Sequence, residues 1–87
     1  MNLQEIEFLR SLGFRIRERR TERKLTQAEL ADRCGLHRTF IGSVERGERN
    51  LSILNLRIIA KALRVPFVEL FADDHRRARP DEAQDGS

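Results

Sequence analysis

The side chains with the clearest capacity for chemistry in this sequence are arginines, and they are concentrated in the middle of the chain. Residues 10–64 contain twelve arginines and two lysines against six acidic residues, a balance of +8, whereas residues 72–87 carry a balance of −2. A guanidinium presents parallel N–H donors that suit phosphate oxygens and the paired acceptors at a guanine edge. We therefore expect the middle of the chain to meet an anionic partner, with nucleic acid as the leading candidate. The plainer alternative is that most of these charges solvate exposed helix faces.

Other kinds of chemistry find little support in the sequence. No glycine-rich phosphate loop, cluster of metal ligands or nucleophile with a neighbouring base occurs, so we expect no enzymatic activity, cofactor, metal site or small-molecule substrate. The single cysteine, Cys34, excludes an internal disulfide and is expected in the core rather than as a redox sensor. No apolar run approaches the roughly 20 residues of a membrane span, and the N-terminus lacks the pattern of a signal peptide. We expect a soluble, cytoplasmic protein.

Helices must position the arginines, because apolar residues recur at helical spacing and period-two alternation is missing. The first helix is expected over residues 3–23, with Gly13 either kinking it or dividing an extension from a core helix. A length of 87 residues allows one small domain. The expected fold is all-α, with a helical extension over residues 1–11, a compact five-helix domain over 12–71 and a disordered charged tail over 72–87.

Capping signals set the remaining helix boundaries. Thr26 and Glu29 form a capping box, in which the threonine hydroxyl accepts from the Glu29 N–H and the carboxylate accepts from the Thr26 N–H. Gly35 suits the left-handed residue that ends a helix, and Ser52 is a favourable N-cap. These signals predict helices over residues 27–33, 38–46, 53–63 and 66–71, the last of them beginning at Pro66.

Two of these helices form a motif. Two short helices joined by a turn that contains glycine constitute a helix-turn-helix unit, and residues 27–46 meet its physical requirements. Ala31 is small where the helices approach each other, and Gly35 lies where the turn needs a positive φ. Apolar residues occupy the positions expected to face the core between the helices: Leu30, Cys34, Leu36, Ile41 and Val44.

Over about residues 12–71 the chain resembles the Cro/cI-type helix-turn-helix regulators, the xenobiotic-response-element family. The resemblance is carried by Thr26-Gln27-Ala28-Glu29-Leu30-Ala31, Gly35-Leu36, Ile41, Val44-Glu45-Arg46-Gly47 and Arg49-Asn50. The stretch from Arg38 to Ser52 is also similar to controller proteins of restriction–modification systems. The resemblance implies a lambda-repressor-like fold and a sequence-specific, double-stranded DNA-binding regulator of transcription, either repressor or activator, whose recognition helix over residues 38–46 enters the major groove.

The resemblance also implies roles for individual residues. The family's base-contacting positions fall on Arg38, Thr39 and Ser43, which are expected on one helix face, and its phosphate-contacting positions fall on Gln27, Arg46, Arg49 and Asn50. Arg20 and Glu45 match a semi-buried ion pair between the first and third helices. The plainer interpretations are exposed helix residues, solvated loop charges and, at Ser43, a small residue that permits close approach. Gly42 lowers helix propensity, which indicates that something approaches its backbone closely.

We expect a homodimer on a palindromic operator, because one short recognition helix buries too little surface for tight, specific binding. The fifth helix has more apolar surface than one face can bury, so its residues are the candidate interface: Phe67, Val68, Leu70 and Phe71. The N-terminal extension is the rival interface. The alternative function is an antitoxin-like or bridging module that uses the same fold to bind proteins, and the basic character of the recognition face favours DNA.

Overall fold

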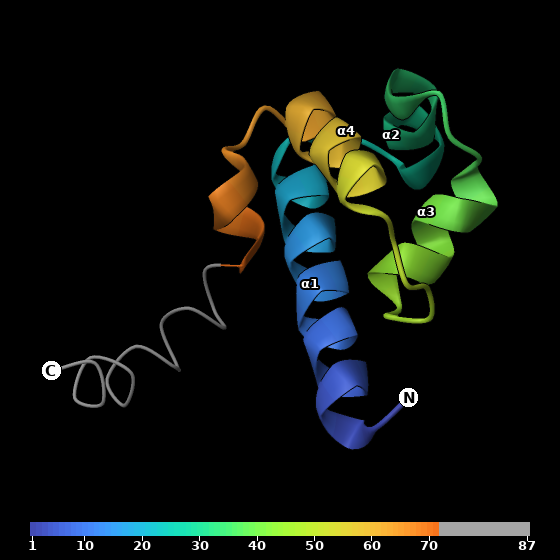
Figure 1. Ribbon diagram of the computed structural model, residues 1–87. Coiled ribbons are helices and arrows are strands. Elements are labelled where there is room, and N and C mark those ends of the chain that lie inside the picture. The colour runs from blue at the N-terminus through green and yellow to red at the C-terminus, as the bar shows by residue number, and fades with distance from the viewer. Residues whose placement is uncertain (72–87) are drawn as a thin grey trace, which may run out of the picture.

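The computed structural model describes residues 1–71, and every regular element within them is a helix (Figure 1). Four are α-helices: α1 (Leu3–Glu22), α2 (Gln27–Cys34), α3 (Arg38–Glu45) and α4 (Ile53–Leu63). The fifth element, η1 (Phe67–Phe71), is a 3₁₀ helix. The expected all-α fold is confirmed for this part of the chain, whereas the prediction of a fifth α-helix is wrong. The tail predicted over residues 72–87 lies outside the described residues.

The tighter winding of η1 follows from its length and from its first hydrogen bond. The Glu69 N–H donates to the Pro66 carbonyl at 2.9 Å, which is the three-residue spacing of a 3₁₀ turn. The element is only five residues long, and 3₁₀ winding is common in segments this short. Proline therefore begins a helical segment here as predicted, but not an α-helix.

α1 is a single helix of 20 residues that continues through Gly13. It begins with a capping box of its own, in which the Asn2 side chain accepts from the Glu5 N–H at 2.8 Å and the Glu5 carboxylate accepts from the Asn2 N–H at 3.0 Å. A Cβ atom at position 13 would lie 2.4 Å from the carbonyl oxygen of Val44 and 2.5 Å from that of Glu45. The missing side chain of Gly13 thus lets α1 lie directly against the end of α3.

The boundaries of α2 and α3 follow the capping signals. The Thr26 hydroxyl accepts from the Glu29 N–H at 3.0 Å and the Glu29 carboxylate accepts from the Thr26 N–H at 2.8 Å, which confirms the predicted capping box. α2 ends at Cys34 and is followed by Gly35, which has a left-handed conformation with φ 68°. α3 begins after His37, whose ring nitrogen accepts from the Thr39 N–H at 3.2 Å. The two helices form the expected helix-turn-helix unit.

All five elements contribute to one core. The fully buried side chains, in chain order, are Ile16, Leu30, Ile41, Ile59, Leu63 and Leu70. Burying an aliphatic side chain of this size stabilises a fold by about 1.5–3 kcal/mol. α3 contacts both α1 and α2, while η1 covers α1 and α4 away from the helix-turn-helix unit (Figure 1). α3 is therefore buried from Ile41 to Glu45, and its first turn, at Arg38 and Thr39, is left to solvent.

The predicted core positions of the motif lie where expected. Three are buried and two are half-buried against the same cluster: Leu30, Ile41 and Val44, then Cys34 and Leu36. Burial raises the pKa of the Cys34 thiol, which lowers its thiolate fraction at neutral pH. Cys34 is therefore part of the packing of α2, as the sequence indicates.

Candidate nucleic-acid interface

α3 is exposed at its first turn and buried along most of its remaining length. Arg38 and Thr39 are exposed, whereas every residue from Ile41 to Glu45 is buried in this eight-residue helix. Because the core holds the second part of the helix, the first-turn side chains project from a fixed backbone. The helix thus presents a guanidinium and a hydroxyl to a ligand, both of which can donate hydrogen bonds.

Ser43, the third predicted base contact, lies in the buried part of α3. It is 8% exposed, and its hydroxyl donates to the Phe40 carbonyl at 2.8 Å. Successive helix residues are about 100° apart, so Ser43 is rotated by about 140° from Arg38 around the helix axis. By the same geometry Ser43 is only about 40° from Thr39, so it shares a face with Thr39 rather than with Arg38. The base contact of Ser43 stays a prediction.

An open groove of about 550 Å³ lies between the start of α2 and α3. It brings together four of the predicted DNA contacts, namely Gln27, Arg38, Thr39 and Arg46. Arg20 also lines the groove, and none of its lining residues is acidic. The groove is therefore positively charged, open to solvent and suited to a polyanion.

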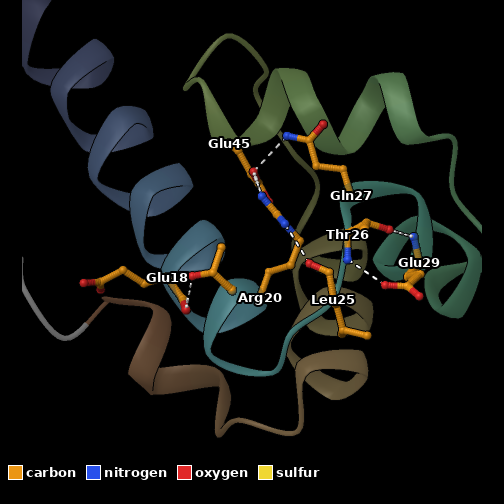
Figure 2. A network of polar contacts seen from close by, with 8 residues as sticks. Glu18, Arg20, Leu25, Thr26, Gln27, Glu29 and Glu45 are labelled. Carbon is orange, nitrogen blue, oxygen red and sulfur yellow. Dashed lines mark hydrogen bonds and ion pairs between the residues drawn. The ribbon is translucent and has the colours of Figure 1, made fainter.

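Beside this groove, Arg20 of α1 and Glu45 of α3 form the predicted ion pair (Figure 2). Nε of Arg20 donates to one carboxylate oxygen at 2.6 Å and Nη2 donates to the other at 3.0 Å, so the contact is bidentate. The two side chains are 11% and 3% exposed. The hydrogen bond to Glu45 raises the pKa of Arg20 above its ordinary value. Nη1 of Arg20 donates to the Leu25 carbonyl at 2.7 Å, which ties α1 to the loop before α2.

Gln27 bridges the two helices of the motif. Its side-chain nitrogen donates to Oε1 of Glu45 at 3.0 Å, which joins α2 to the ion pair (Figure 2). Its side-chain oxygen lies 3.3 Å from the position that a Cβ atom on Gly42 would take. Nη1 of Arg46 lies still nearer to that position, at 3.2 Å, so the close approach expected at Gly42 is made within the protein by Arg46 and Gln27. The phosphate contact of Gln27 stays a prediction, and its second amide hydrogen is the available donor.

The other predicted phosphate contacts follow α3. Nε of Arg46 lies 3.1 Å from the carboxylate of Glu48, and both side chains are 58% exposed. The guanidinium carbon of Arg49 lies 5.5 Å from the centre of the Phe40 ring. Asn50 is exposed and lines a cavity beside the N-terminal end of α1. The sequence predicts neither Glu48 nor Phe40 as a partner, because the conformation of a loop decides which of its side chains meet.

The candidate dimer interface on η1 is only partly exposed. Phe67 and Val68 are exposed, and Phe71 is half-buried, with ring-centre distances of 5.3 Å to Phe67 and 6.1 Å to Phe8 of α1. Leu70 is 1% exposed, so its assignment to the interface is wrong, because its side chain belongs to the core of the protomer. Leu3, in the N-terminal extension that is the rival interface, is also exposed. Three further exposed apolar side chains lie where the sequence marks no interface: Phe14, Ile53 and Leu54.

Two negative findings apply to residues 1–71. No helix in this part of the chain combines the length and the apolar character needed to cross a membrane. The same residues contain no group of three or more histidine, cysteine, aspartate or glutamate side chains that could hold a metal ion.

A short helix that is fixed by the core, crossed by a second short helix and basic at its exposed first turn defines a helix-turn-helix protein. A family model described as helix-turn-helix matches residues 16–70. The chain belongs to this helix-turn-helix family, of the Cro/cI type that the sequence resembles.

Several relatives are control proteins. The chain is 44% identical to control protein C.SmaI of Serratia marcescens over 70 residues, which cover 80% of this chain and 77% of that protein. The crystal structure of the restriction–modification controller protein C.AhdI from Aeromonas hydrophila is 46% identical, covers 72% of this chain and 96% of that chain, and has a TM-score of 0.71. The controller protein C.Esp1396I, solved as a tetramer with its natural 35 base-pair operator, is 40% identical, covers 75% of this chain and 86% of that chain, and has a TM-score of 0.69.

Proposed function

We propose that this protein is a sequence-specific, double-stranded DNA-binding regulator of transcription that acts in the cytoplasm and controls a restriction–modification system. One observation carries the proposal: buried residues hold α3 while Arg38 and Thr39 stand exposed beside the basic groove. An α-helix fits the major groove of DNA, and the N-terminal residues of a recognition helix contact base edges. The control proteins among the relatives, and the operator bound by C.Esp1396I, support the same assignment.

Arg38 and Thr39 are the base readers in this proposal. The guanidinium of Arg38 matches the two adjacent acceptors of guanine, and Thr39 offers a hydroxyl to either a donor or an acceptor and a methyl group to thymine. A positive charge in the first turn of a helix opposes the helix dipole, which costs stability in the free protein. Binding in the negative potential of a DNA groove offsets that cost at Arg38.

Phosphate contacts hold α3 in register. Arg46, Arg49 and Asn50 follow the C-terminal end of α3, while Gln27 begins α2 and lines the groove. The start of α2 adds backbone N–H groups, which favour an anion at a helix N-terminus. Contacts of this kind carry no sequence information, but each one adds to the affinity and to its dependence on salt.

Selecting binding sites from a random pool of duplexes tests the proposed function. We expect one consensus with two-fold symmetry, whose half-site centres lie about 10 base pairs or a multiple of that apart. The double variant Arg38→Ala/Thr39→Ala is the control, because it should lose the consensus and keep salt-sensitive binding through the phosphate contacts. Recovery of no consensus by the parent protein would overturn the proposed function.

We expect the protein to be a homodimer at micromolar concentration, with Phe67 and Val68 in the interface. Both side chains are exposed in the protomer, and an exposed apolar surface is suited to a two-fold contact. Sedimentation should give twice the mass of one chain. Val68→Glu should shift the equilibrium toward monomer, whereas Phe14→Glu, at an exposed position on α1, should not. A parent protein that sediments as a monomer both with and without DNA would contradict this prediction.

A further inference from the structure

The two arginines that follow α3 are held in different ways. Arg46 is paired with the carboxylate of Glu48, whereas Arg49 lies over the ring of Phe40. Within residues 1–71, no carboxylate lies within ion-pairing distance of Arg49. The Arg46 guanidinium therefore has an acidic partner, and the Arg49 guanidinium has an aromatic one.

The loop after α3 places Arg49 over the ring. Gly47 has a left-handed conformation with φ 74°, which reverses the chain at the end of the helix. The N–H of Glu48 then donates to the Ser43 carbonyl at 2.9 Å, so the loop returns along the side of α3. The reversal brings Arg49 back beside Phe40, nine positions earlier in the chain.

Phe40 is itself fixed in place. Its ring is half-buried and packs against the hydrophobic core from α3. An anchored ring offers a flexible cation a defined position, because a guanidinium near an aromatic face is attracted by the quadrupole of the ring. The contact therefore reduces the freedom of the Arg49 side chain before any ligand arrives.

The two modes of holding have different consequences for phosphate binding. A guanidinium has five N–H donors and binds phosphate by presenting two of them in parallel. The carboxylate of Glu48 lies 3.1 Å from Nε of Arg46, so a phosphate must compete with Glu48 for that donor. An aromatic ring takes no strong hydrogen bond from them, so Arg49 keeps its donors available.

We propose that Phe40 is a positioning residue for DNA binding, which holds the Arg49 guanidinium ready for a backbone phosphate without contacting DNA itself. The inference rests on the proposed function and adds to it an apolar residue of α3. Preorganisation of this kind lowers the cost of ordering a long side chain on binding. The contribution of Phe40 to DNA affinity should therefore depend on the presence of Arg49 and be the same on every DNA sequence.

A double-mutant cycle tests the inference. The parent protein, Phe40→Leu, Arg49→Ala and the double variant are titrated over a salt series against the duplex selected from the random pool and against a scrambled duplex. Phe40→Leu should weaken binding to both duplexes about two- to fivefold, which matches the strength of an exposed cation–π contact. It should weaken binding no further in the Arg49→Ala background. Phe40→Tyr keeps the ring and should keep the affinity of the parent.

Matched controls separate this effect from charge and from folding. Lys61→Ala removes a cation from the last turn of α4, which lies at the opposite end of the domain from the loop after α3 (Figure 1), and should leave affinity nearly unchanged. Thermal unfolding is measured for every variant, and Phe40→Met, which has no ring and a similar volume, replaces Phe40→Leu if the latter is unfolded.

Three outcomes would overturn the inference. In the first, Phe40→Leu weakens binding equally with and without Arg49. In the second, Phe40→Leu leaves the affinity unchanged although Arg49→Ala reduces it. In the third, Arg49→Ala changes neither the affinity nor the salt slope. The proposed function fails by a separate result, in which the parent protein binds the selected and scrambled duplexes equally.

Discussion

Replacing Arg38 with alanine is expected to weaken binding to the operator by roughly tenfold to a hundredfold, and to weaken binding to random DNA far less. The physical reason is the bidentate contact between a guanidinium and the O6 and N7 acceptors of guanine, which discriminates by about 1–3 kcal/mol. Arg38 is exposed at the start of α3, so its replacement removes the proposed base reader and no packing. A competition titration against operator and scrambled duplexes across a salt series measures both changes in affinity.

Arg49→Ala is the matched control for Arg38→Ala, because each variant lacks one guanidinium. A phosphate contact is indifferent to sequence, so Arg49→Ala should weaken binding to both duplexes nearly equally and reduce the salt slope by about 1 for each phosphate that is no longer neutralised. Arg38→Ala should also relax the preference at one position in each half-site of the operator. An equal decrease in affinity on both duplexes for Arg38→Ala would show that Arg38 contacts phosphate, and Thr39 would then be the remaining base reader.

Replacing Glu45 with alanine is expected to lower the free energy of unfolding by about 3 kcal/mol, because it removes one partner of a buried ion pair. The carboxylate is 3% exposed and accepts two hydrogen bonds from Arg20 and one from Gln27. Without it, the Arg20 guanidinium stays mostly buried with the Leu25 carbonyl as its remaining acceptor. In a domain of this size such a decrease in stability lowers the melting temperature by roughly 10–20 °C.

Glu48→Ala provides the control for Glu45→Ala. Glu48 is also a glutamate paired with an arginine, but it and Arg46 are both 58% exposed, and exposed pairs contribute about 0–1 kcal/mol. Chemical denaturation of the two variants compares a buried with an exposed pair in one protein. An unfolding midpoint of Glu45→Ala equal to that of the parent would contradict the structural role of the pair. Glu45→Ala should also weaken DNA binding, because the pair and Gln27 together set the position of α3 against α1 and α2.

The helix boundaries can be predicted from the sequence because capping is local. Thr26, Glu29 and Ser52 satisfy backbone groups within three residues of themselves, so their chemistry can be recognised without knowledge of the fold. The Arg20–Glu45 pair joins residues 25 positions apart, and only the family resemblance predicts it. Local chemistry thus predicts where helices begin and end, and the family pattern predicts how they meet.

The sequence-based predictions differ from the structure at residues whose burial or contacts depend on tertiary packing. Motif position groups Ser43 with Arg38, but Ser43 is 8% exposed and its hydroxyl donates to the Phe40 carbonyl. Apolar character assigns Leu70 to the dimer interface together with its neighbours in η1. In the structure Leu70 is the one residue of η1 that is fully buried. The contact of Arg49 with Phe40 depends on a chain reversal at Gly47, so no spacing rule predicts it.

The division of α3 into an exposed first turn and a buried remainder has a consequence for how new binding preferences arise. Arg38 and Thr39 lie outside the core, and substitutions at exposed positions usually change stability by less than about 0.5 kcal/mol. The packed residues from Ile41 onward keep the helix in place whatever side chains precede them. If Arg38 and Thr39 read the operator as proposed, a library varied only at positions 38 and 39 is expected to sample new specificities on an unchanged scaffold.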